Sequence, residues 1–315
     1  MIALVTGGAS SGKSGFAEEL CGVLSKRDGC RKLYLATMKN DGKEAAERIR
    51  RHRSLRAGKG FETIEAENTA QIGALQTASG DLILLETLSV LAANEMFSEC
   101  GVLAGAQDET SEEIARRIFD SLKTLVCRHL ILVSDEIFSD GLEWEGQSYD
   151  PMTLRYLEVL GILHRLAAGE AELVAEVAAG GILFRKGKEL VDIDQYSDSS
   201  PVPGLHLVIS GAYQGGEEYG KRMYPEAVQL SDLYERFREA LKEGRNPEQE
   251  LDEEIEGALR QGELAVWALE IGSGVVPIDP FTRSLRERYG RYLCRLAGRA
   301  FSVERLYCGL SERIR

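Results

Sequence analysis

The sequence predicts an α/β protein in which a mostly parallel sheet is flanked by helices and is followed by a shortened second α/β copy. Three observations support this prediction: a glycine-rich turn between the first strand and the first helix, strands that alternate with helices, and a pattern that restarts near residue 205. Alternation implies parallel pairing, because parallel strands need a crossover connection. We expect a first domain over residues 1–188, a polar linker over 189–204 and a second domain over 205–315.

The glycine-rich turn has the spacing of a phosphate-binding loop. It fits the pattern Gly-x-x-x-x-Gly-Lys-Ser/Thr of P-loop NTPases, and it joins an apolar strand to a helical pattern. Glycines let successive N–H groups point at phosphate oxygens, and the helix N-terminus adds the positive end of its dipole. Lys13 is expected to reach the β- and γ-phosphates and Ser14 to hold Mg²⁺, whereas the alternative is an ordinary Gly/Ser turn. The loop consists of Gly7, Gly8, Ala9, Ser10, Ser11, Gly12, Lys13 and Ser14.

Polar residues end the next strands of the first domain. Thr37, Glu86 and the pair Asp135–Glu136 each follow an apolar run. In doubly wound sheets ligands bind beyond the carboxyl ends of the strands, so we expect these residues beside the phosphate loop. Glu86 is a candidate Mg²⁺ ligand, although a carboxylate at a strand end is often only a helix cap. The expected strands are residues 32–37, 81–85, 129–133 and 171–177. One expected helix runs from the phosphate loop to about residue 30, and two others span residues 114–125 and 154–166.

A strongly charged segment at residues 41–56 has helical spacing and contains His52 among several arginines, including Arg48 and Arg56. Neighbouring cations lower the pKa of a histidine, and the resulting neutral imidazole can attack phosphorus. The same arginines could neutralise a triphosphate. The alternative for His52, taken alone, is a solvated residue on a basic helix.

The second domain repeats the pattern in shortened form. An apolar strand at residues 205–210 leads into a glycine-rich loop at 211–216 and then a helix, but Gly216 stands at the place of Lys13. This self-similarity indicates a duplication whose second copy has lost a strand or two. The other expected elements are an acidic helical segment at 248–259, a strand at 264–269, a helix at 285–296 and a strand at 303–308.

Composition excludes some classes of protein. The net charge of −13 argues against nucleic acid as a partner, because a phosphate backbone demands a basic face. No apolar run reaches the ~18–20 residues needed to cross a bilayer, and the N-terminus resembles no signal peptide. The six cysteines form no Cys-x-x-Cys pair, which favours reduced thiols in a cytoplasmic protein.

Taken together, these motifs resemble the bifunctional adenosylcobinamide kinase/adenosylcobinamide-phosphate guanylyltransferases of cobalamin biosynthesis. The phosphate loop is generic, whereas the Arg-Ile-x-x-His and Glu-Ile-Gly-x-Gly-Val-Val-Pro elements are much more specific. The resemblance covers nearly the whole chain, spread over both copies. It rests on residues 7–14, Arg48, Ile49, His52, Arg56, Glu65, Glu86, Asn94, residues 270–277, Arg283, Arg286, Glu287, Gly290 and Arg291.

The resemblance implies two reactions. A γ-phosphate from ATP or GTP passes to the hydroxyl of adenosylcobinamide, a corrinoid, with Mg²⁺ as cofactor. A histidine matched by His52 then takes GMP from GTP as a phosphoramidate and passes it to the cobinamide phosphate. The resemblance also places Glu65 among the nucleotide-binding residues and implies active sites near subunit contacts.

The sequence departs from the family pattern in an ordered way. The first copy keeps the phosphate loop and His52 but lacks the Gly-x-Gly-Val-Val-Pro stretch, which the second copy keeps. We therefore expect one composite site per chain, formed as an intrachain pseudo-dimer or within a homo-oligomer; the alternative is independent decay of the copies. The second copy would contribute Glu270, Gly272, Gly274, Pro277, Arg283 and Arg286.

Two other functions stay open on the sequence alone. One is a P-loop kinase of a small metabolite, in which the insertion at residues 138–150 forms a lid or an acceptor pocket. The other is a non-catalytic GTP-binding regulator, in which the second copy only caps the first.

Overall fold

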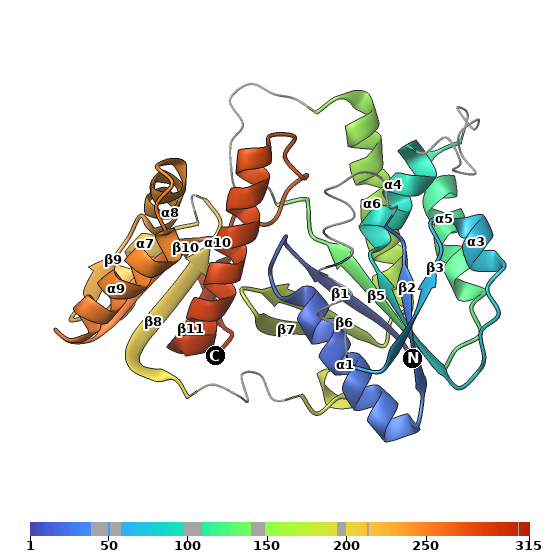
Figure 1. Ribbon diagram of the computed structural model, residues 1–315, viewed down its shortest axis with the longest axis horizontal. Helices are drawn as coiled ribbons and strands as arrows, with labels where there is room; N and C mark the ends of the chain where they lie inside the picture. The colour runs from blue at the N-terminus through green and yellow to red at the C-terminus, as the bar shows by residue number, and fades with distance from the viewer. Residues whose placement is uncertain are drawn as a thin grey trace.

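The computed structural model describes residues 1–38, 50, 58–97, 109–139, 149–193, 200–212, 214–307 and 309–315. Within these ranges the chain forms two sheets in succession, each with its own helices (Figure 1). Among the described helices, none is long and apolar enough to cross a membrane.

The first sheet has seven strands in the order β3-β2-β4-β5-β1-β6-β7. Its neighbouring strands pair in parallel, except that β7 runs antiparallel to β6. This arrangement confirms the predicted mostly parallel sheet flanked by helices. The strands are β1 (Ile2–Gly7), β2 (Arg31–Ala36), β3 (Phe61–Glu65), β4 (Asp81–Glu86), β5 (His129–Asp135), β6 (Leu173–Ala178) and β7 (Gly181–Lys186).

Helices cover both faces of this sheet, because its central strands carry apolar side chains on both sides. Every residue of β4 is buried. On one face α1 packs Phe16, Leu20 and Leu24 against the strands, and the remaining helices share a second cluster on the other face (Figure 1). The helices are α1 (Lys13–Asp28), α3 (Thr69–Gly73), α4 (Leu88–Phe97), α5 (Ser111–Lys123) and α6 (Pro151–Glu170), and a 3₁₀ turn, η1 (Lys188–Leu190), follows β7.

The second, shorter α/β region forms a five-stranded sheet in the order β12-β11-β8-β10-β9. Its core is centred on Phe237, Tyr289 and Tyr292, and the same buried cluster takes in Ala179 and Leu183 of the first region. The two regions therefore share a hydrophobic core. The elements are β8 (Val202–Ser210), α7 (Gly216–Met223), β9 (Val228–Leu230), α8 (Leu233–Lys242), α9 (Pro247–Leu259), β10 (Leu264–Leu269), α10 (Pro280–Arg299), β11 (Ala300–Tyr307) and β12 (Leu310–Arg313).

Strand order relates the two sheets. The series β10-β8-β11-β12 repeats β5-β1-β6-β7, and β9 lies beside β10 as β4 lies beside β5. Gly7 pairs with Asp135, and Ser210 pairs with Leu269, so residues 7–13 correspond to residues 210–216. This correspondence supports the predicted duplication. Within the described residues, the second sheet has no counterpart of the two outer strands β2 and β3.

Some predicted boundaries shift. Strand β8 begins at Val202, inside the predicted linker 189–204, and the antiparallel strand β7 was not predicted. The charged segment 41–56 lies outside the described residues apart from Arg50.

Candidate functional site

The phosphate loop leads into an open helix N-terminus. Gly12, at the N-cap of α1, has a left-handed backbone with φ of 97°, a conformation that glycine adopts without strain. No side chain caps this end, and the first turn carries no acidic residue. The first N–H groups of α1 and the positive end of its dipole are therefore directed at a prospective anion.

Ser14 lies beside the carboxylate that the sequence predicts as its partner. Its hydroxyl donates to Glu86 Oε1, while the buried Tyr34 donates its hydroxyl to Glu86 Oε2 at 2.8 Å. A serine hydroxyl and a carboxylate are oxygen ligands of the kind that Mg²⁺ takes, together with phosphate oxygens and water. No group of three or more ligating side chains suited to a metal ion occurs among the described residues. The hydroxyl of Ser14 and the carboxylate of Glu86 are two oxygen donors that fit a Mg²⁺ ion.

The amine of Lys13 points back toward the sheet. Its Nζ lies 2.8 Å from Asp135 Oδ1 and donates to the carbonyl oxygen of Gly8 at 3.1 Å. The hydroxyl of Ser89 donates to the other oxygen of Asp135. Sequence reasoning noted Asp135 at its strand end but gave it no role, and it did not single out Tyr34 or Ser89. The available signal for Asp135 was its position on the strand next to β1.

The second region reaches this loop through the segment after β10. The N–H of Ala9 donates to the carbonyl oxygen of Gly272 at 2.8 Å. A Cβ on Gly8 would lie 2.8 Å from the carbonyl carbon of Gly272, and a Cβ on Gly272 would lie 2.8 Å from the Ala9 oxygen. The two backbones can meet only because both positions are glycine. Helix α10 lies beside the phosphate loop, since Cys294 on α10 donates its thiol to Ser10 O at 3.3 Å, and in Figure 1 α10 stands near the start of α1.

The two predicted arginines donate hydrogen bonds to backbone carbonyl oxygens of this segment. The buried guanidinium of Arg286 donates to the carbonyl oxygens of Gly272, Gly274 and Val275 at 2.7–2.9 Å. Arg283 donates to Pro277 O at 3.0 Å. Through these contacts both arginines hold the segment at residues 270–277, here called the glycine segment, in place.

Glu270 faces the boundary between the regions. Its carboxylate accepts from Nε of Arg305 at 3.1 Å, and Arg305 also binds Glu176 on β6. Burial raises the pKa of Glu270. Burial also acts on Glu176, but Arg305 and Arg185 outweigh it and lower the pKa of that carboxyl group. Glu270 thus anchors the start of the glycine segment to the first region.

The second loop has lost its phosphate site. A Cβ on Gly216 would lie 2.1 Å from Nε1 of Trp267, and this indole donates to Ser210 Oγ at 2.9 Å. A lysine at position 216 therefore has no room. The second loop lacks the lysine that binds phosphate. Within the described residues, the loop at residues 7–14 is therefore the candidate phosphate site.

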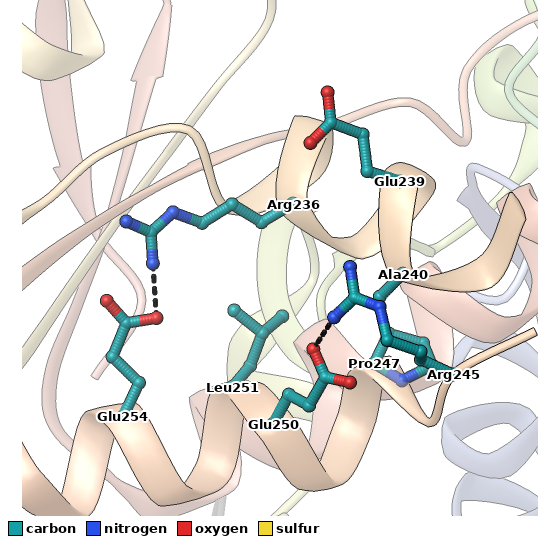
Figure 2. Close-up of a pocket in the computed structure, with 8 residues that line it drawn as sticks. All are labelled: Arg236, Glu239, Ala240, Arg245, Pro247, Glu250, Leu251 and Glu254. Atoms are coloured by element: carbon teal, nitrogen blue, oxygen red, sulfur yellow. Dashed lines mark hydrogen bonds and ion pairs between the residues drawn. The ribbon is translucent and has the colours of Figure 1, made fainter. Parts of the chain in front are cut away.

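A separate groove lies between α8 and α9 (Figure 2). Its arginines are already paired, Arg236 with Glu254 and Arg245 with Glu250. Both positive charges in the lining are therefore already compensated, and the groove shares no lining residue with the phosphate loop.

Of the remaining predicted residues, some are described by the structure and others are not. Glu65 ends the edge strand β3 and is exposed, and Asn94 donates to the carbonyl oxygens of Thr37 and Glu67 at the ends of the two outer strands. His52, Arg48 and Arg56 lie outside the described residues.

The strand, loop and helix at the N-terminus define a P-loop nucleotide-binding protein. A family model described as cobinamide kinase / cobinamide phosphate guanyltransferase (CobU) matches residues 3–184, more than half of the chain. The bifunctional adenosylcobalamin biosynthesis protein CobU of Salmonella typhimurium (strain LT2) is 30% identical over 198 residues, covering 59% of this chain and 100% of that protein. The chain belongs to the cobinamide kinase / cobinamide phosphate guanyltransferase family, an enzyme family whose transferase reactions consume nucleoside triphosphates. The predicted family is confirmed.

Proposed function

We propose that this chain phosphorylates adenosylcobinamide and then transfers GMP from GTP to adenosylcobinamide phosphate, at one composite site per chain. Family membership supports the two reactions. The observation that carries the composite site is the hydrogen bond from Ala9 in the intact phosphate loop to Gly272 in the second region. On this proposal the chain is an intrachain pseudo-dimer, with a first domain over residues 1–188 and a second domain that begins with strand β8 at Val202.

In the kinase step the first region holds the triphosphate. The open amides of the loop and the amine of Lys13 bind its phosphate oxygens, as the geometry of α1 supports. Ser14 and Glu86 would hold Mg²⁺, which when bound offsets charge on the β- and γ-phosphates. The corrinoid hydroxyl oxygen then attacks the γ-phosphorus, the bond from this phosphorus to the β–γ bridging oxygen breaks, nucleoside diphosphate leaves, and the hydroxyl proton passes to water. Catalysis here is positioning and charge stabilisation by the loop.

In the guanylyl step His52 is the nucleophile. Its imidazole nitrogen attacks the α-phosphorus of GTP, a P–N bond forms, and pyrophosphate leaves as the α–β bond breaks. An oxygen of the cobinamide phosphate then attacks the same phosphorus and releases the histidine. Arg48 and Arg56 would offset the charge that develops on the phosphates, and Glu65 would lie near the nucleotide.

The second region supplies the wall of the site. Gly272 and Gly274 lie in the segment that meets the phosphate loop, Glu270 anchors its start, and Pro277 accepts from Arg283 near its end. Arg286 holds the carbonyl oxygens of this segment in place. Loss of the corresponding stretch from the first copy is thereby compensated.

Labelling with GTP tests this proposal. Incubation with α-³²P-GTP and Mg²⁺ should give an acid-labile, protein-bound label, because phosphoramidates hydrolyse in acid. The label should be absent from His52→Ala and retained in His129→Ala, which changes a histidine paired with Asp28. Unlabelled wild-type protein that still turns over nucleotide would instead favour a small-metabolite kinase. GTP binding with no transfer to any corrinoid would favour a regulator.

A further inference from the structure

The lysine of the phosphate loop is already paired with a carboxylate. Lys13 Nζ lies 2.8 Å from Asp135 Oδ1, and the side chains of Lys13 and Asp135 are 9% and 31% exposed. Ser89 donates to the second oxygen of Asp135, and Thr87 Oγ1 lies 2.8 Å from Ser89 Oγ. Asp135 is therefore fixed in orientation, and it cancels much of the charge that the loop would offer to an anion.

The second loop of the same chain has neither the lysine nor the aspartate at the corresponding positions. The strand register that pairs Gly7 with Asp135 pairs Ser210 with Leu269. Gly216 stands at the position of the lysine, and the indole of Trp267 fills its space. Both members of the charge pair are therefore absent together from the loop that has lost its phosphate site.

We propose that Asp135 is a specificity-determining residue that makes the phosphate loop select metal-bound over metal-free nucleoside triphosphate. The inference rests on the proposed function only in that the loop binds a triphosphate. A bound triphosphate draws the amine of Lys13 to its own oxygens. This exchange moves the ammonium group of Lys13 from Asp135 toward the ligand and leaves the carboxylate of Asp135 next to the polyphosphate.

The charge of the ligand then decides its affinity. A metal-free triphosphate is repelled by Asp135 and by Glu86, the carboxylate that accepts from the hydroxyl of Ser14. A metal-bound triphosphate brings a divalent cation that offsets both carboxylates. Charges within a few ångströms interact strongly in a partly buried site, so one carboxylate suffices to separate the two forms of ligand.

The experiment measures the dissociation constant of GTP by titration calorimetry, once with excess Mg²⁺ and once with EDTA. For Asp135→Asn we expect binding in EDTA to tighten by about tenfold, because the isosteric amide removes one nearby negative charge. Binding with Mg²⁺ should change by less than about threefold, so the preference for the metal-bound ligand falls. Asp120→Asn, the same change at an exposed site on α5, should leave the preference unaltered.

Two further outcomes decide the inference. An unchanged Mg²⁺ preference in Asp135→Asn, or equal weakening under both conditions, would overturn it. If Asp135→Asn does not fold, Ser89→Ala decides, since it keeps the charge but frees the carboxylate; a smaller loss of preference is expected, and no loss overturns the inference. Failure of the wild type to bind GTP under either condition counts against the proposed function instead.

Discussion

The surroundings of a single side chain can decide whether it carries a charge, as His164 illustrates. His164 on α6 is partly buried: its Nε2 lies 2.7 Å from Ser134 Oγ, and its ring packs edge-on against the ring of Phe138. Burial lowers the pKa of His164 to about 4, and the neighbouring charge of Asp135 raises it only in part. His164 is therefore neutral in the folded protein at every pH above about 4.

This histidine should make the fold sensitive to acid. The unfolded chain takes up a proton at His164 near its ordinary pKa of ~6.5, so the free energy of unfolding falls as the pH drops from ~6.5 toward 4 and no further below. Between pH 7 and 4.5 the wild type should lose about 2.5 kcal/mol more than His164→Gln, whose amide can still bond Ser134. Urea unfolding at both pH values measures the difference. Equal losses in the two proteins would contradict the assignment.

At the scale of elements, apolar runs in the sequence predicted the buried strands of both sheets. The strand expected at residues 264–269 is β10 as observed, and those expected at 81–85 and 129–133 are β4 and β5 with one or two more residues. Strands β3, β7, β9 and β12 were not predicted, because each lies at the edge of a sheet, where a partner strand rather than an apolar run defines the element. Helix α10 begins earlier than its periodicity indicates, since Asp279 caps it and Pro280 opens it.

The candidate site was predicted in part for a physical reason. The phosphate loop and its partners Ser14 and Glu86 follow from spacing and strand ends, which are local properties of the sequence. The pairing of Asp135 with Lys13 and the indole of Trp267 in the second loop depend on side-chain directions across neighbouring strands. Spacing along the chain does not encode such directions.

The backbone conformation of the glycine segment should depend on the hydrogen bonds from Arg286. Arg286→Lys keeps the charge but cannot reach three carbonyl oxygens, and a lost hydrogen bond to a charged group costs roughly 1.5–3 kcal/mol. The bond from Ala9 to Gly272 should then open more often, and amide hydrogen exchange at Ala9 should rise by about tenfold or more. Arg288→Lys on the same helix, which can keep its pair with Glu248, is the control. Unchanged exchange at Ala9 would show that Arg286 does not support the segment.

Across the whole molecule, alternating charges join the two sheets. Glu312 pairs with Arg185, Arg185 with Glu176, Glu176 with Arg305, and Arg305 with Glu270. Beside this series the two regions share one buried apolar cluster. The phosphate loop and the segment that meets it therefore belong to one cooperative body, although they are far apart in the sequence.

Removal of the guanidinium of Arg305 should weaken the coupling between the two regions during unfolding. Arg305→Met leaves Glu270 buried without its main partner, and truncating one member of a buried ion pair typically costs about 3–5 kcal/mol. Calorimetry should give one unfolding transition for the wild type, because the regions share a core, and a lower or divided transition for Arg305→Met. Arg313→Met, on the exposed strand β12, should unfold like the wild type. If Arg305→Met also unfolded like the wild type, the shared apolar cluster alone would hold the second region on the phosphate loop.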